Sequence, residues 1–132
     1  MNSISLQISD ECDIAQAARS AGNLADSVGF NKTLSCHVAT AASELAANMY
    51  FHAQGGLFEA HVMSSHRCGI ELVATDHGPG IASVSEAMRD GFSTTGSLGC
   101  GLPGAKRLMD EMEIRTTPGQ GTSVIVRKWC AP

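Results

Sequence analysis

Polar side chains able to do chemistry recur at helical spacing between positions 37 and 52. They are His37, Thr40, Glu44, Asn48 and His52, three or four residues apart, so a helix here would carry them on one face. A single glutamate on a helix is usually solvated, but small apolar residues surround this face, so its polar groups need partners. A carboxylate and a carboxamide one turn apart could supply a general base and an oxygen ligand for Mg²⁺.

An Asp-x-Gly-x-Gly turn follows an apolar run further along the chain. Asp76 is followed by Gly78 and Gly80, which stand on either side of a proline. Such a turn lets a ligand approach the backbone closely. The carboxylate could accept a hydrogen bond from an exocyclic amine such as that of adenine. An ordinary Asp-Gly turn would account for the same residues without any ligand.

Small hydroxyl residues and glycines fill positions 90–104 and lead into a third helical pattern. Free backbone N–H groups and the positive end of a helix dipole favour an anion, so this segment is a candidate phosphate cradle. Residues 99–104 spell a dinucleotide-binding fingerprint, but neither the preceding strand nor the later acidic residue is present. A P-loop is also excluded, because Ala105 and not a glycine precedes Lys106.

The elements that must position these residues follow from the apolar periodicity. Alternating or short apolar runs predict strands over 4–8, 57–63, 68–75, 113–117 and 122–129. Spacings of three and four predict helices over 14–28, 32–53 and 102–112. Asn31 can cap the second helix, and Pro103 falls in the first turn of the third, where proline is tolerated. Hairpin-connected strands in this order predict an α+β sandwich with helices on one face of a largely antiparallel sheet.

The composition of the chain excludes or disfavours several classes of protein. The 132 residues suit a single domain, and with 43% apolar and 17% charged residues disorder is excluded. Nine basic against 13 acidic residues give a net charge of −4, which disfavours nucleic acid and anionic membranes as partners. No apolar run could span a bilayer and no signal peptide opens the chain, so we expect a cytoplasmic protein. Five cysteines without a Cys-x-x-Cys pair suit reduced thiols.

The three motifs together resemble the GHKL (Bergerat-fold) superfamily of ATPases and kinases, over Val38 to Thr122. Within that superfamily, the chain is similar to the small RsbT-type serine/threonine switch kinases of the anti-sigma regulatory factor group. The similarity lies in residues 42–46, 90–94, 99–104 and 107–111 and in the closing Lys128 and Trp129. Cys100 stands where alanine is expected. The resemblance implies a Bergerat-fold α/β sandwich with a mixed, largely antiparallel sheet, forming one kinase domain over residues 1–132.

The resemblance also implies roles for individual residues. Glu44 would be the general base for phosphoryl transfer, Asn48 would hold Mg²⁺ on the phosphates of ATP, and Asp76 would bind the adenine amino group. The other nucleotide-binding positions would be Gly78, Gly80, Ile81, Thr95, Leu98, Gly99, Cys100, Gly101, Leu102, Gly104 and Thr122.

The glycine-rich segment 93–104 would act as a lid, mobile without nucleotide and ordered by ATP. Lys106 and Arg107 are the cations nearest to it in the sequence. We expect them to form helix-surface pairs with Asp110 and Glu111, four residues further on, and not to bind phosphates.

The implied function is that of a Mg-ATP-dependent protein serine/threonine kinase. Its substrate would be a STAS-domain antagonist protein (RsbS- or RsbR-like), and phosphorylation would release the kinase to a downstream phosphatase or other effector. This is partner switching in a stressosome-type pathway. Two alternatives stay open: an anti-sigma factor kinase of the RsbW or SpoIIAB type, which binds a sigma factor directly, and a non-catalytic ATP-sensing module. Glu44 argues against the second, because a pure binder needs no base.

Overall fold

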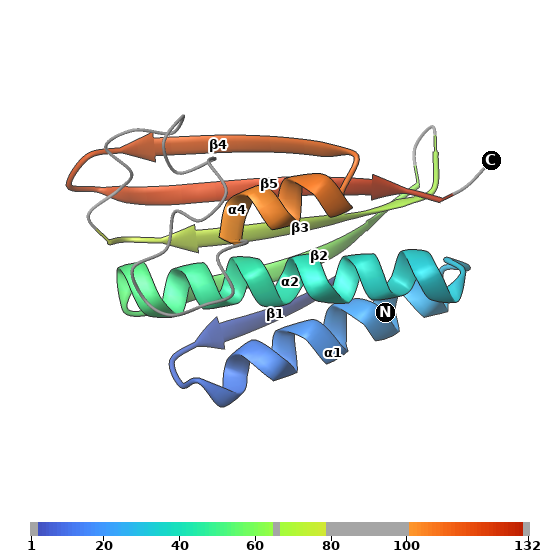
Figure 1. Ribbon diagram of the computed structural model, residues 1–132, viewed down its shortest axis with the longest axis horizontal. Helices are drawn as coiled ribbons and strands as arrows, with labels where there is room; N and C mark the ends of the chain where they lie inside the picture. Colours follow the sequence, from blue (N-terminus) through green and yellow to red (C-terminus); the bar gives the residue numbers. More distant parts are fainter. Residues whose placement is uncertain (1–2, 65–66, 79–100, 131–132) are drawn as a thin grey trace.

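The computed structural model describes residues 3–64, 67–78 and 101–130. The elements run in the order β1 (Ser3–Ile8), α1 (Cys12–Ser27), α2 (Lys32–Ala53), β2 (Gly56–Met63), β3 (Gly69–Asp76), α4 (Gly101–Leu108), β4 (Glu111–Thr117) and β5 (Gly121–Trp129), as Figure 1 shows. Within these residues the strands form one sheet in the order β1-β2-β3-β5-β4. Every pairing among them is antiparallel, and the predicted α+β sandwich is confirmed.

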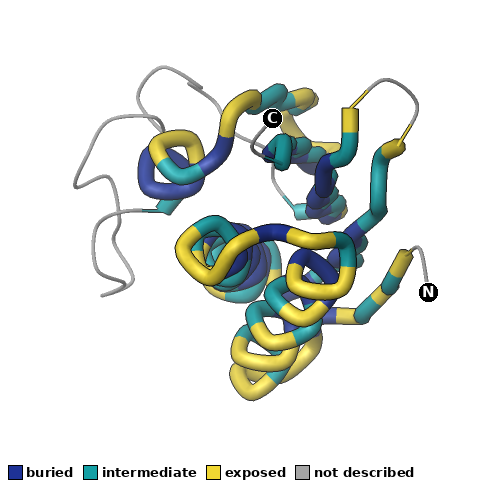
Figure 2. The backbone as a smooth tube through the Cα atoms, turned by 90° about the vertical axis from the view of Figure 1, so that its right-hand side faces the viewer, coloured by how far each residue is buried: buried dark blue, intermediate teal, exposed yellow. Residues whose placement is uncertain are grey.

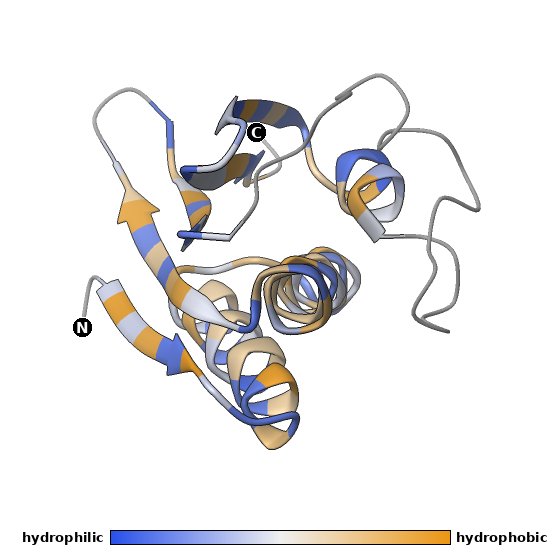
Figure 3. Ribbon diagram, turned by 90° about the vertical axis from the view of Figure 1, so that its left-hand side faces the viewer, coloured by the Kyte–Doolittle hydropathy of each residue, from blue (hydrophilic) through white to orange (hydrophobic). Residues whose placement is uncertain are grey.

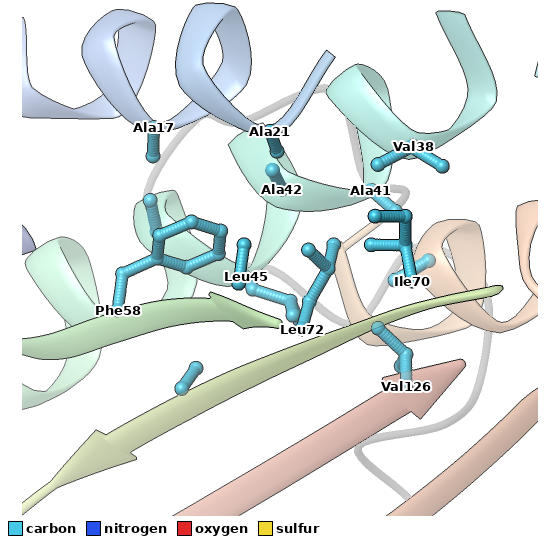
Figure 4. Close-up of a cluster of buried hydrophobic side chains, with 14 of the residues drawn as sticks. Ala17, Ala21, Val38, Ala41, Ala42, Leu45, Phe58, Ile70, Leu72 and Val126 are labelled. Carbon is cyan, nitrogen blue, oxygen red and sulfur yellow. The ribbon is translucent and has the colours of Figure 1, made fainter. Parts of the chain in front are cut away.

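Helices and sheet form two layers with the core between them. Even-numbered residues of β2, β3 and β5 are the more buried ones, while odd-numbered residues lie on the other face of the sheet. The bands of alternating hydropathy along the strands are visible in Figure 3, and Figure 2 shows where the buried stretches of the backbone lie. Side chains from both layers interdigitate in Figure 4, among them Ala17, Ala21, Val38, Leu45, Phe58, Ile70, Leu72 and Val126.

Helix α2 spans the predicted residues, and its ends have local causes. The side chain of Asn31 accepts a hydrogen bond from the N–H of Leu34 at 2.9 Å, which caps the first turn. At the other end Gln54 adopts a left-handed conformation, and the N–H of Gly55 bonds to the Met49 carbonyl at 2.9 Å. Val38, Ala41, Leu45 and Met49, which recur at helical spacing, are buried, and the face that carries Glu44 and Asn48 lies beside this apolar stripe.

Helix α4 is shorter than predicted. It ends at Leu108, whose carbonyl accepts a hydrogen bond from the ammonium of Lys128 at 2.7 Å. Asp110 then accepts from the N–H of Trp129 and Glu111 pairs with Arg127, so both acidic residues bind β5. The predicted helix-surface pairs with Lys106 and Arg107 are therefore wrong, because the helix does not extend to their acidic partners.

Two cysteines far apart in the sequence meet where β3 begins and β5 ends. The N–H of Cys130 donates to the carbonyl of Cys68 at 2.9 Å. Burial, together with the neighbouring Cys68 thiol, raises the pKa of Cys130 to about 11. The four cysteines in the described residues are free thiols, as the sequence predicts. Among those residues, no helix has both the length and the apolar character needed to cross a membrane.

Candidate nucleotide site

Asp76 lies at the end of β3 with its carboxylate held in place from two sides. Its Oδ1 accepts hydrogen bonds from the backbone N–H of Gly78 at 2.9 Å and from that of Thr122 at 3.2 Å. The residue is 7% exposed. Within the part of the chain that the structure describes, Oδ1 takes both of these donors and Oδ2 takes none. No donor among the described residues competes for this second oxygen.

Glycines allow the backbone around Asp76 to pack this closely. A Cβ on Gly78 would lie 2.6 Å from the Cβ of Ala53, the last residue of α2. Gly121 has φ +122°, and a side chain there would collide with the carbonyl oxygen of Asp76. The Asp-x-Gly turn is thus pressed against the end of α2 on one side and the start of β5 on the other.

A pair of threonine hydroxyls lies beside Asp76. Asp76 is opposite Thr122 in the β3–β5 register, and Thr122 is opposite Thr116 in the β4–β5 register. The Oγ1 atoms of the two threonines are 3.0 Å apart. All three residues line a cavity of about 540 Å³ at this end of the sheet, with His77, Ile114 and Gln120. Thr122 is one of the predicted site residues, whereas nothing in the sequence pattern singles out Thr116.

Glu44 and Asn48 occupy one face of α2, one turn apart, and both are half-buried. Helix α4 packs against α2, and the backbone N–H of Gly101 at its start hydrogen-bonds the Glu44 carboxylate. This bond favours the charged form, but burial outweighs it and raises the pKa of Glu44 above its ordinary value. The pair therefore combines a base of increased proton affinity with an amide oxygen.

One helix connects the two groups. Ala53, which touches the Asp76 turn, lies nine residues after Glu44 on α2, or about 14 Å along the axis at the usual helical rise. Asn48 lies between them. The arrangement is an elongated site, with the carboxylate and threonines at one end and the Glu44–Asn48 pair towards the middle of the helix.

The donor set fits a magnesium ion shared with phosphates. Mg²⁺ prefers oxygen ligands and usually keeps phosphate oxygens and waters in its shell. The Asn48 amide and Glu44 carboxylate offer oxygen on one helix face, and no cluster of three or more His, Cys, Asp or Glu exists among the described residues. An ion here would therefore need a ligand's oxygens to complete its coordination.

The glycine-rich segment is described only from Gly101 onwards, where it forms the first turn of α4. Gly101 has φ +32°, and Leu102 and Gly104 are buried. Because the Leu102 side chain belongs to the core, only its backbone could face a phosphate. The predicted site residues Gly80, Ile81, Thr95, Leu98, Gly99 and Cys100 lie outside the described residues, as does most of the predicted lid.

Comparison with known proteins identifies the family. Residues 8–128 match the model of the histidine kinase-like ATPase domain. The chain is 41% identical to the serine/threonine-protein kinase RsbT of Bacillus subtilis (strain 168) over 94% of both chains. It is 31% identical to the anti-sigma F factor of Thermoanaerobacter sp. (strain X514), over 70% of this chain and 68% of that protein.

Solved structures show the same fold at low identity. The mycobacterial sensor histidine kinase MprB has a TM-score of 0.58 at 14% identity and covers 100% of this chain and 99% of its own. A histidine kinase domain from Erythrobacter litoralis EL346 has a TM-score of 0.54 at 18% identity, over 93% of this chain and 64% of that chain.

The chain belongs to the histidine kinase-like ATPase domain family. The predicted membership of the GHKL superfamily is confirmed, as is the prediction that the chain groups with its serine/threonine-protein kinases. Anti-sigma factors are relatives as well, at lower identity and coverage.

Proposed function

We propose that the chain is a Mg-ATP-dependent protein serine/threonine kinase that acts by partner switching. The observation that carries the proposal is the placement of Glu44. It is a half-buried carboxylate with raised pKa, on the same helix face as Asn48 and hydrogen-bonded at the start of α4. A site built only to hold a nucleotide would gain nothing from a carboxylate at that position, because its negative charge would repel the phosphates.

The base of the nucleotide would bind at the Asp76 end. With Oδ1 held by two backbone N–H groups, Oδ2 can accept a hydrogen bond from the amino group of adenine. Gly78 removes the side chain that would otherwise fill the space between the turn and α2. Gly80, Ile81 and Thr122 are proposed to complete this end of the site.

Phosphoryl transfer would take place at the Glu44–Asn48 pair. Asn48 would hold Mg²⁺ through its amide oxygen, and the ion would supply charge neutralisation on the phosphates. Glu44 would take the proton of the acceptor hydroxyl while the hydroxyl oxygen bonds the γ-phosphorus and ADP departs. A raised pKa makes the carboxylate a stronger base for that transfer. The remaining predicted positions, Thr95 and Leu98 to Gly104, are proposed to surround the phosphates.

The acceptor is proposed to be a serine or threonine of a STAS-domain antagonist protein in the cytoplasm, in a stressosome-type pathway. Phosphorylation would release the kinase to a phosphatase or another effector. Similarity to RsbT over 94% of the chain supports this assignment over direct sigma-factor binding. The second candidate, an anti-sigma factor kinase, is favoured only by the lower similarity to the anti-sigma F factors.

The test is transfer of label from ATP that is marked on its γ-phosphate. The purified chain is mixed with STAS-domain proteins and sigma factors encoded in the same genome, with Mg²⁺ or with a chelator. We expect a labelled serine or threonine on a STAS-domain protein, only when Mg²⁺ is present. ATP binding without label on any STAS-domain protein, together with tight binding of a sigma factor, would contradict the proposal.

A further inference from the structure

Asp76, Thr122 and Thr116 form one row across three strands. They are direct cross-strand partners on β3, β5 and β4, and all three line the same cavity. Thr122 is 6% exposed and Thr116 is half-buried. The proposed function uses Asp76 and Thr122 but assigns nothing to Thr116, although its hydroxyl contacts that of Thr122.

The contacts of the Thr116 hydroxyl bear on the direction in which the Thr122 hydroxyl points its proton. A threonine hydroxyl has one proton to donate and two lone pairs to accept with. Thr116 Oγ1 lies 3.3 Å from the carbonyl oxygen of Gly121, which can only accept, so Thr116 is the donor in that bond. Either hydroxyl could donate in the 3.0 Å contact between Thr116 and Thr122. With the Thr116 proton on the Gly121 carbonyl, the donor in this contact is Thr122. In that arrangement the Thr122 hydroxyl presents lone pairs beside Asp76.

We infer that Thr116 is a positioning residue for nucleobase selection: by accepting the hydrogen bond that the Thr122 hydroxyl donates, it makes Thr122 a second acceptor beside Asp76. This inference rests on the proposed function, in which Asp76 binds the base. Two acceptors suit a base with an exocyclic amino group at this position, as in adenine. A base with a carbonyl oxygen there, as in hypoxanthine or guanine, would leave those acceptors unpaired, which is a costly mismatch in a buried site.

The sharpest test compares ATP with ITP, whose base carries a carbonyl oxygen in place of the amino group of adenine. Thr116→Val keeps the branched shape but removes the hydroxyl, so the Thr122 proton becomes free to turn towards the ligand. We expect the preference for ATP over ITP in calorimetric binding to fall by about threefold to tenfold, which is the usual worth of one hydrogen bond. ATP affinity should fall while ITP affinity stays constant or rises.

Two further variants separate this role from a structural one. Thr33→Val is the matched control, because Thr33 is an exposed threonine in the first turn of α2 and does not line the cavity. It should leave the ATP-to-ITP ratio unchanged. Thr122→Val should lower the ratio as Thr116→Val does, and the double variant should lower it no further, because Thr116 acts through Thr122.

An equal loss of affinity for both nucleotides in Thr116→Val, or additive effects in the double variant, would overturn the inference alone. A folded wild-type chain that binds neither nucleotide would overturn the proposed function, and the inference with it.

Discussion

Among the described residues, backbone N–H groups bond only Oδ1 of Asp76, and the proposed function gives Oδ2 to the nucleotide. In Asp76→Asn the retained oxygen can still accept both backbone bonds, but an NH₂ group replaces the second acceptor. We expect ATP affinity to fall by about tenfold or more, since a mismatched buried polar group costs roughly 1–3 kcal/mol. Calorimetry on the folded variant measures the change. Unaltered ATP affinity would reduce Asp76 to a turn residue.

Glu44 is assigned to the chemical step and not to binding. Glu44→Ala should abolish phosphoryl transfer to a STAS-domain partner and leave ATP affinity within a few-fold, because Asn48 and Asp76 are untouched. Ser43→Ala is the matched control: Ser43 is the preceding residue of α2, and its hydroxyl bonds only the Thr40 carbonyl among the described contacts. It should retain both properties. Loss of binding and transfer together in Glu44→Ala would show that the carboxylate is structural.

The raised pKa of Glu44 gives a pH dependence with a definite sign. Burial disfavours the carboxylate, so the folded chain holds this proton more tightly than the unfolded chain does. Stability from this group is present below the ordinary pKa of 4.5 and is lost as the pH rises through the higher, folded-state pKa. The rate of phosphoryl transfer should fall as the pH drops through the folded-state pKa of Glu44, which lies above 4.5. Glu44→Gln should remove this part of the pH dependence of unfolding, measured by denaturant titration at several pH values.

At the scale of elements, the site depends on how closely β5 approaches the end of β3. Gly121 permits that approach, because a Cβ there would meet the Asp76 carbonyl oxygen. Gly121→Ala should lower both ATP affinity and the free energy of unfolding, the latter by at least the roughly 1–3 kcal/mol of a strained backbone conformation.

Gly119→Ala is the control for Gly121→Ala. Gly119 also has positive φ, at +80°, but nothing lies within 4 Å of an added Cβ. Gly119→Ala therefore introduces backbone strain but no steric collision. This variant should lower the free energy of unfolding and leave ATP affinity unchanged. Equal ATP affinity in both variants would contradict the role given to this close approach.

At the scale of the whole molecule, nucleotide and partner should bind with linked affinities. Helix α4 packs on the helix that carries Glu44 and Asn48, and its start is bonded to Glu44. The proposed function places the phosphates at that junction, so exchanging ATP for ADP should alter the surface around α4 and change the affinity for the proposed STAS-domain partner. Titrations of the partner with each nucleotide measure the coupling. Equal affinities, with a sigma factor binding tightly instead, would favour the anti-sigma alternative.

Local chemistry made much of this protein predictable. Helix 32–53 follows from its apolar spacing, its Asn31 cap and the glycines beyond its end, all of which act within a few residues. That periodicity also placed Glu44 and Asn48 on one face. The Asp-x-Gly turn follows from residue types whose backbone preferences are intrinsic. These interactions join residues that are close in the sequence, so they can be predicted from the sequence alone.

Contacts between distant segments required the folded chain. Asp76 and Thr122 are 46 positions apart, and their bond depends on β5 lying between β3 and β4, an order that no local pattern specifies. That order makes Thr116 the neighbour of Thr122, and it ends α4 at Leu108 by bringing Lys128 to its carbonyl. Periodicity states which face of a strand is buried, but not which strand lies beside it. The choice of neighbours comes from packing two layers around one core, which is a property of the whole chain.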